Sequence, residues 1–393
     1  MLHRRVSPVP RLALTVEGST ELIVPAGGLG ARAPATTPAF FNPAARVNRD
    51  VSVAVAAVTR PRTFLDALAG VGARGVRVAK EVRGVHVTMV DFNSASVSMA
   101  RRNVERNRVS GRCRVVKEET NVFMHSRFRR SEKFAAVDVD PFGTPAQYVL
   151  GALVAAADGA VVSVTATDTA VLCGTYPSVA FRRYGVRIER SEFMHEAGIR
   201  ALVGFCARVG GTLDVGVEPV AAHSTLHYMR VYLRVARRAT ASEKAVRSLG
   251  YVTSCGSCHE KHVGEREEAS CRSCGARVRP MGPLWVGPVV DEGLVGEAAE
   301  FCSSKGWGDS ARALLPLRGV DACPPYSHSI EQVASREGLS SVRLGDVVER
   351  LRASGREAMR QPFGAPGVKT DAPYSEVLGA VREASREYPR QTK

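Results

Sequence analysis

The stretch that decides the fold reads Phe134-Ala-Ala-Val-Asp138-Val-Asp140-Pro141-Phe142-Gly143-Thr144-Pro145. An apolar run typical of a buried parallel strand ends here in a carboxylate, a proline and an aromatic ring. Parallel sheets place their working residues in the crevice at the carboxyl ends of the strands. Asp140 offers an acceptor for an amino group there, and Phe142 offers a face for a flat substrate. An acidic turn after a strand is also common without any function, so the surrounding sequence must decide between the two.

A second stretch lies upstream and points to a cofactor. It reads Asp66-Ala-Leu-Ala-Gly70-Val-Gly72-Ala-Arg74-Gly75, a short strand that runs through a glycine turn into a helix. Glycines let a ligand approach the backbone, and the helix N-terminus offers free N–H groups. The next strand ends in Asp91, where an acidic side chain suits ribose hydroxyls. The dinucleotide fingerprint is incomplete and no phosphate-binding Lys-Ser/Thr follows, so S-adenosylmethionine fits better than NAD or ATP.

Strands and helices alternate around these two stretches. Strands are predicted over residues 63–68, 85–90, 112–116, 134–139, 159–165 and 228–235, and helices over 48–58, 73–82, 94–107 and 145–156. Such alternation predicts an α/β fold with a mainly parallel sheet. Leu213, Val215 and Val217 alternate with polar or small residues, which predicts an antiparallel pair with the 228–235 strand at the sheet edge.

Charge is distributed unevenly over the 393 residues. The chain has a net charge of +15, and residues 1–240 hold 33 Lys and Arg against 19 Asp and Glu. Excess positive charge on one part of a chain is typical of proteins that bind a polyanion. The alternative is a solvated, arginine-rich surface. Local clusters that favour nucleic acid are Arg101, Arg102, Arg106, Arg108; Arg127, Arg129, Arg130, Lys133; and Arg182, Arg183, Arg187, Arg190.

Four of the nine cysteines form two matched Cys-x-x-Cys pairs, Cys255/Cys258 and Cys271/Cys274. Two such knuckles can supply a tetrahedral thiolate site for zinc. Four protein ligands leave no open position, so the zinc would be structural. Two redox pairs are the alternative reading.

Composition and length suggest more than one domain. We expect an N-terminal segment over residues 1–39, a catalytic domain over 40–239, and a C-terminal mixed α/β domain over 240–393 that holds the zinc site. No apolar run is long enough to span a bilayer. We therefore expect a cytoplasmic protein that acts without a membrane, and the sequence indicates no obligate protein partner.

The sequence resembles the archaeal and eukaryotic tRNA (guanine-26, N2)-dimethyltransferases from about residue 7 to about residue 295. The segments that carry the resemblance are Phe40-Phe-Asn-Pro43, Asn48-Arg49-Asp50, Asp66-Ala-Leu-Ala-Gly70, Asp138-Val-Asp-Pro-Phe-Gly-Thr-Pro145, Thr165-Ala-Thr-Asp168 and His195-Glu-Ala-Gly-Ile-Arg200. The resemblance implies a class I S-adenosylmethionine-dependent methyltransferase domain of Rossmann-like fold, followed by a C-terminal domain peculiar to the family. Some members carry a four-cysteine zinc site where Cys255, Cys258, Cys271 and Cys274 stand.

The resemblance also implies roles for single residues. Arg49, Arg74 and Asp91 would contact S-adenosylmethionine. Glu119 and Thr120 would lie near the adenine. Many members have Asp-Ala at these two positions, so Glu-Thr is a departure from the family pattern, although glutamate can still accept from the adenine N6 amine. Asp140 matches the catalytic aspartate, with Phe40 and Phe142 as walls of the pocket. These eight residues form the predicted site.

Two other functions stay open. The acceptor could instead be an adenine N6 or a protein amide, because Asp-Pro-Phe resembles the Asn/Asp-Pro-Pro-aromatic motif of those enzymes. The chain could also be a non-catalytic, zinc-stapled RNA-binding protein. The combination of Arg49, Asp91 and Asp140 favours an enzyme, and the Phe40 and Asn48 segments favour guanine N2 in tRNA. The sequence does not decide between one and two methyl groups.

Overall fold

A seven-stranded sheet forms the centre of the fold, with strand order β5-β4-β3-β6-β7-β9-β8. The computed structural model describes residues 11–29, 39–127, 132–225 and 227–387. Strand β3 (Thr63–Asp66) pairs in parallel with β4 (His86–Asp91) and with β6 (Phe134–Val139), and β4 pairs in parallel with β5 (Cys113–Lys117). The chain moves outward from β3 to β5 and then returns to the other side of β3. This reversal creates a topological switch point between β3 and β6.

The antiparallel edge follows the prediction in kind but not in position. Strands β8 (Gly216–Thr225) and β9 (Tyr228–Ala236) pair antiparallel, and β8 is the edge strand. The alternation at Leu213 and Val215 belongs to the residues before β8, so that strand begins later than predicted. Strand β7 (Ala156–Ala166) completes the sheet.

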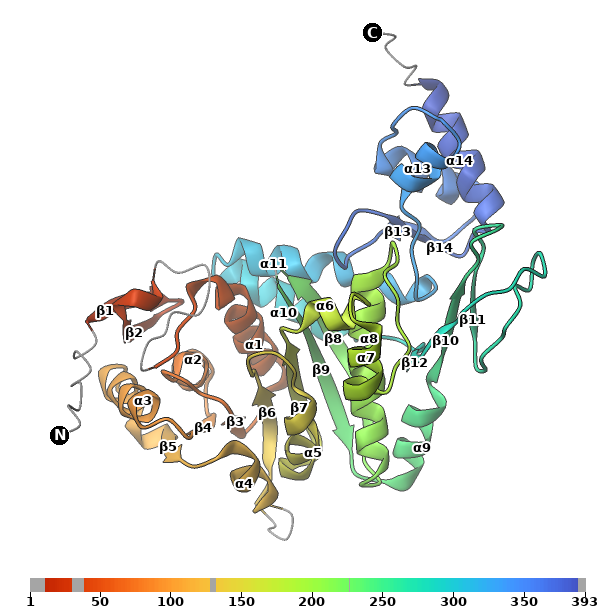
Figure 1. Ribbon diagram of the computed structural model, residues 1–393. Coiled ribbons are helices and arrows are strands. Elements are labelled where there is room, and N and C mark those ends of the chain that lie inside the picture. The colour runs from red at the N-terminus through yellow and green to blue at the C-terminus, as the bar shows by residue number, and fades with distance from the viewer. Residues whose placement is uncertain (1–10, 30–38, 128–131, 226, 388–393) are drawn as a thin grey trace, which may run out of the picture. The chain divides into compact units, whose positions relative to one another are not determined.

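The helices between the strands lie close to their predicted positions (Figure 1). They are α1 (Arg46–Thr59), α2 (Ala73–Glu81), α3 (Ser94–Arg106), α4 (Thr120–His125) and α5 (Ala146–Ala155). Asn93 caps α3, since its side-chain oxygen accepts the Ala95 N–H at 2.8 Å. The sequence did not predict α4, whose six residues are too few for a periodic pattern.

The chain divides into two compact units. Unit 1 comprises residues 1–140, 151–162 and 297–311, and unit 2 comprises residues 141–150, 163–296 and 312–393. The boundary expected at residue 240 stays a prediction.

In unit 1, residues 12–25 form a hairpin. Strands β1 (Leu12–Glu17) and β2 (Thr20–Pro25) turn at Gly18, which has a φ of 56°. Leu22 and Val24 are fully buried. Asn103 of α3 fixes the hairpin, because its side chain donates to the Ile23 carbonyl at 3.0 Å and accepts the Ile23 N–H at 2.7 Å.

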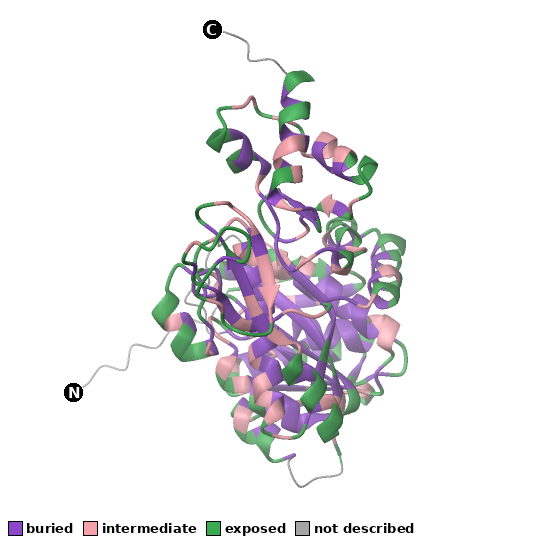
Figure 2. Ribbon diagram, turned by 90° about the vertical axis from the view of Figure 1, so that its right-hand side faces the viewer, coloured by how far each residue is buried: buried purple, intermediate pink, exposed green. Residues whose placement is uncertain are grey.

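Unit 2 is rich in helices and carries two small sheets. A three-stranded sheet has the order β11-β10-β12, and a two-stranded sheet pairs β13 with β14. Figure 2 shows that most helices of unit 2 contain both buried and exposed residues. Among the described residues, no helix combines the length and apolarity needed to cross a bilayer.

Besides β8 and β9, the helices and strands after β7 are α6 (Thr169–Leu172), α7 (Pro177–Tyr184), α8 (Met194–Gly211), α9 (Ala239–Arg247), β10 (Leu249–Ser254), β11 (Lys261–Gly264), β12 (Met281–Trp285), α10 (Glu292–Ser304), α11 (Gly308–Leu314), α12 (Ile330–Arg336), α13 (Leu344–Ala353), β13 (Ala358–Arg360), β14 (Val368–Thr370) and α14 (Tyr374–Glu387).

Candidate active site

Two carboxylates pair with one arginine at the switch point, and a third lies on the neighbouring strand. Asp66 and Asp138 are register neighbours at the ends of β3 and β6, and Asp140 follows two residues later. Arg74 of α2 forms ion pairs with Asp138, at 3.1 Å, and with Asp140. The side chains of Arg74 and Asp138 are almost fully buried, whereas that of Asp140 keeps 25% of its surface exposed. Asp140 is therefore the member of this pair of acids that a substrate can reach.

Arg74 has further partners on α1. Besides the two aspartates, it donates to the Ser52 hydroxyl and approaches the Asn48 carbonyl at 3.5 Å. These contacts hold the Asp140 carboxylate in a fixed orientation. Contact between Arg74 and a cofactor stays a prediction.

Asp66 orients the glycine turn. Its Oδ2 accepts the Gly75 N–H at 2.9 Å. Burial raises the pKa of Asp66 to about 7; Arg74 opposes this rise, and the charges of Asp138 and Asp140 add to it.

We expect Asp66→Asn to change how stability depends on pH. Between about pH 4 and pH 7 the folded chain binds a proton at Asp66 that the unfolded chain has lost, so its free energy of unfolding falls as pH rises through this window. The variant lacks this titration and keeps an acceptor for Gly75. Its stability relative to the wild type should rise by roughly 2 kcal/mol between pH 5 and pH 7.5. Urea unfolding at both pH values measures this difference, with the exposed Asp214→Asn as control; a difference that does not change with pH refutes the shift.

A further carboxylate, that of Asp91, lies at the end of the neighbouring strand β4. Asp91 ends β4, and its two oxygens accept the Gly70 N–H and the Asn93 N–H, each at 2.8 Å. Each carboxylate oxygen can accept a further hydrogen bond, which leaves capacity for two hydroxyls. Gly72 precedes α2 with a φ of 78°, a conformation that favours glycine, and a Cβ at this position would lie 3.0 Å from the Cβ of Ala100.

Glu119 and Thr120 start α4 beyond β5. The Glu119 side chain caps that helix by accepting the Val122 N–H at 2.8 Å, and it is exposed. The Thr120 hydroxyl is buried and donates to the Ala67 carbonyl at 2.6 Å. Thr120 thus ties α4 to the strand that carries Asp66, and its part in cofactor binding stays a prediction.

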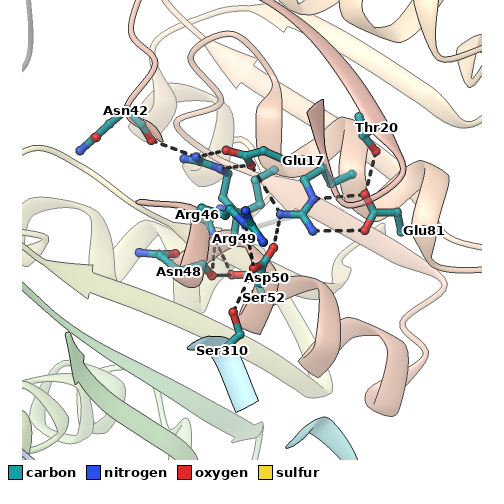
Figure 3. Close-up of polar contacts among 12 residues, drawn as sticks. Glu17, Thr20, Asn42, Arg46, Asn48, Arg49, Asp50, Ser52, Glu81 and Ser310 are labelled. Atoms are coloured by element: carbon teal, nitrogen blue, oxygen red, sulfur yellow. Dashed lines mark hydrogen bonds and ion pairs between the residues drawn. The ribbon is translucent and has the colours of Figure 1, made fainter. Parts of the chain in front are cut away.

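Arg49 lies in a buried ion network rather than at an open surface (Figure 3). Its guanidinium donates to Glu17 of the hairpin at 2.7 Å and to the Asn42 carbonyl at 2.9 Å, and it lies 5.0 Å from the centre of the Phe41 ring. Burial by itself raises the pKa of Glu17, but Arg49 and Arg77 lower it below its ordinary value. The structure therefore gives Arg49 a clamping role, and its predicted contact with cofactor is not tested.

Phe40 and Phe142 belong to different units. Phe40 is partly buried, and its carbonyl lies 3.2 Å from where a Cβ at Gly70 would stand. Phe142 is 62% exposed in the loop after β6. In that loop, Gly143 donates to the Thr167 hydroxyl at 2.6 Å and accepts the Thr167 N–H at 2.9 Å. That both rings wall one pocket stays a prediction.

One exposed ring escaped the sequence analysis. Phe92 follows Asp91 directly and is 70% exposed. An exposed aromatic ring next to the Asp91 carboxylate is suited to stacking against a flat base. The signal was available, since Phe92 falls outside the apolar run of β4 and adjoins a predicted binding residue.

The four paired cysteines come together in unit 2. Their sulfur atoms all lie within 4.8 Å of one another, and Cys255–Cys274 and Cys258–Cys271 are each separated by 3.6 Å. Tetrahedral zinc with Zn–S bonds of about 2.3 Å needs sulfurs about 3.8 Å apart. The geometry therefore fits a metal. His262 lies 4.0 Å from the Cys271 sulfur and contacts Ser273 at 3.0 Å.

The His195–Arg200 segment is structural in part. Glu196 of α8 is fully buried and accepts from Lys369 at 2.6 and 2.7 Å and from Arg200 at 3.0 Å. Most described members of the basic clusters are exposed, namely Arg101, Arg102, Arg106, Arg108, Arg182, Arg183, Arg187 and Arg190. Arg127 is buried, and Arg129 and Arg130 lie outside the described residues.

The sheet order, the glycine turn and the ion-paired Asp140 define a protein of the class I, S-adenosylmethionine-dependent methyltransferase fold. The family model for N2,N2-dimethylguanosine tRNA methyltransferases matches residues 17–382. The chain belongs to this family, which confirms the resemblance seen in the sequence.

Relatives of the chain agree with that assignment. A tRNA (guanine(26)-N(2))-dimethyltransferase from Methanothermobacter thermautotrophicus is 34% identical over 92% of this chain and 96% of its own length. One from Methanoculleus marisnigri is 37% identical over 86% of this chain and 90% of its own length. The structure of Trm1 from Pyrococcus horikoshii with S-adenosyl-L-methionine superposes with a TM-score of 0.83 at 27% identity, covering 94% of this chain and 99% of that one.

Proposed function

We propose that this chain transfers methyl groups from S-adenosylmethionine to the exocyclic N2 of guanine-26 in tRNA, giving N2-methyl- and N2,N2-dimethylguanosine. The observation that carries the proposal is Asp140: a partly exposed carboxylate at the switch point, ion-paired to Arg74, in a chain of this family. The matched relatives bear the name of this activity.

Binding of S-adenosylmethionine would use the Gly70–Gly72 turn and Asp91. The hydrogen bonds that Asp91 accepts from Gly70 and Asn93 fix its oxygens for the ribose hydroxyls. Phe92 and Glu119 would face the adenine, and Arg49 and Thr120 would support the surrounding backbone. When bound, the cofactor supplies a methyl group already activated by the sulfonium.

Asp140 can make the acceptor amine of guanine more nucleophilic. The lone pair of guanine N2 is delocalised into the ring, so the amine is a poor nucleophile. If the Asp140 carboxylate and the carbonyl beside it accept the two N2 hydrogens, the amine becomes pyramidal and its lone pair is freed. Asp140 then receives the proton that N2 releases. Alignment of the amine by a fixed carboxylate supplies the rest of the acceleration.

The target base must leave the helical stack. Guanine N2 points into the minor groove of a paired stem, where the methyl donor cannot approach it in line. Phe142, which is 62% exposed, offers a face for the extruded ring, with Phe40 as the proposed second wall.

We propose that Cys255, Cys258, Cys271 and Cys274 hold a structural zinc ion. The local core consists mainly of these residues: Cys255, Cys271 and Val278 are buried there, with Cys258 and Ala276 against them. So little apolar surface supplies little stability by itself, and bound metal would supply it instead. His259, with a φ of 61°, and Gly275, with a φ of 75°, end the two knuckles in matching conformations.

We expect Cys258→Ser to release this metal. The purified wild type should contain one zinc per chain by elemental analysis, and the variant should contain well under half of that. Residues 255–280 should then become sensitive to protease. Cys113→Ser, outside the cluster, serves as control and should retain zinc. A metal-free wild type with an intact, protease-resistant knuckle would contradict the assignment.

A direct assay tests the proposed activity. Pure protein is incubated with labelled S-adenosylmethionine and an unmodified tRNA transcript, and the nucleosides are then separated. We expect label on guanosine. Label on adenosine alone would favour the adenine N6 reading, and tRNA binding without any transfer would favour a non-catalytic RNA-binding protein.

The location of the protein in the cytoplasm stays a prediction.

A further inference from the structure

Two aromatic side chains, one on α7 and one directly before it, are largely exposed to solvent. Phe181 is 63% exposed and Tyr176, which precedes the helix, is 55% exposed. Ala180 and Tyr184, one turn apart on the same helix, are fully buried. Phe181 therefore occupies an outward position where an amphipathic helix would carry a polar residue.

Helix α7 is fixed at its C-terminal end. Arg208 of α8 donates to the Gly185 carbonyl at 2.8 Å and to the Tyr184 carbonyl. The Phe205 ring packs edge-on against Tyr184 at 5.5 Å. A rigid support of this kind presents exposed rings at low entropic cost.

The same helix is bonded to the loop that follows Asp140. The Tyr184 hydroxyl contacts the Thr144 hydroxyl at 2.8 Å and donates to Asp168 at 2.8 Å. Asp168 also accepts from Arg183 at 3.0 Å, and its N–H donates to the Gly143 carbonyl at 3.3 Å. Helix α7 and the Phe142 loop are thus joined by hydrogen bonds within unit 2.

Positive charge follows the exposed rings along the chain. Arg182 follows Phe181 and is exposed, Arg183 is 37% exposed, and Arg190 is exposed further along. Aromatic faces interleaved with arginines on a rigid element suit unpaired nucleotides, because bases stack on the rings while cations meet the phosphates. A protein partner would not require this excess of positive charge.

We propose that Tyr176 and Phe181, with Arg182, form a docking surface for the tRNA nucleotides next to the methylated guanine, which lose their stacking partner when that base is extruded. The proposal rests on the proposed function, since a base extruded toward the Phe142 loop brings its neighbours to α7. The surface would stack one or two bases and hold the adjoining backbone after the target base has left the helix.

The test measures affinity of the full chain for unmodified tRNA at several salt concentrations. The Tyr176→Ala/Phe181→Ala double variant should bind about 5- to 150-fold more weakly for each stack lost, without a change in the salt slope. Arg182→Ala should reduce the slope of log K against log salt by about 0.7 to 0.9. Phe181→Trp, which keeps a ring, should bind like the wild type.

Leu315→Ala, which truncates another exposed apolar side chain (49% exposed), is the matched control. Unchanged melting temperature and S-adenosylmethionine affinity show that each variant is folded. The docking surface is refuted if the double variant binds tRNA like the wild type, if the control loses affinity equally, or if the double variant changes only self-association. In the first of these cases the wild type still makes N2-methylguanosine, so the function stands; a wild type that makes none refutes the function and the surface together.

Discussion

We expect Asp140→Ala to lower the rate of methyl transfer to tRNA by about 100-fold or more, with affinity for S-adenosylmethionine and for tRNA nearly unchanged. The size follows from the loss of a preorganised group that acts on the reacting amine. The fold should persist, because Arg74 keeps its ion pair with the buried Asp138 at 3.1 Å. Single-turnover assays at saturating cofactor and tRNA measure the rate without contributions from binding.

Two further variants separate the carboxylate from its position. Asp140→Asn keeps the shape but presents an amide, and should be almost as slow as Asp140→Ala. Asp214→Asn, at an exposed aspartate with a φ of 53° that asparagine also adopts, should be as fast as the wild type. An Asp140→Ala variant that transfers methyl at the wild-type rate would remove Asp140 from the mechanism.

The second large effect is expected on stability, from Arg77→Leu. The Arg77 side chain is fully buried and meets Asp50 at 2.6 Å, Glu81 at 3.2 Å and Glu17 at 3.5 Å, with its guanidinium 4.8 Å from the Trp307 ring centre. Removing this cation leaves buried carboxylates without their shared partner. The free energy of unfolding should fall by about 3–5 kcal/mol.

Arg106→Leu is the matched control for that variant. Arg106 also pairs with a glutamate of the hairpin, Glu21, at 2.8 Å, but the two side chains are 38% and 47% exposed. Its loss should cost no more than about 1 kcal/mol. Urea unfolding compares both; equal costs would show that burial of the Arg77 network does not determine its contribution.

Local pattern was enough to predict the sheet. Each strand from β3 to β7 is an apolar run bounded by turn residues, and each intervening helix except α4 has a clear period, so fold class followed from residues close in sequence. The cysteine cluster was predicted for the same reason, because Cys-x-x-Cys spacing is itself local geometry. The glycine turn with Asp66 and Asp91 belongs to this group as well.

Partner choice among charged side chains could not be predicted in this way. Arg49 and Arg74 looked equally free to meet a ligand, yet one is clamped by Glu17 and the other joins two aspartates. Those pairings join residues 32 to 66 positions apart, and they depend on packing that periodicity does not reveal. For the same reason the exposed ring of Phe181 emerged only when burial was known.

The most direct measurement is nucleoside analysis of two tRNA transcripts that differ only at position 26. After incubation with pure protein and S-adenosylmethionine, the transcript with guanine at this position should yield N2-methyl- and N2,N2-dimethylguanosine. The transcript with adenine there should yield neither. Methylation of both transcripts at equal levels, or of adenosine alone, would contradict a guanine-26 N2-methyltransferase.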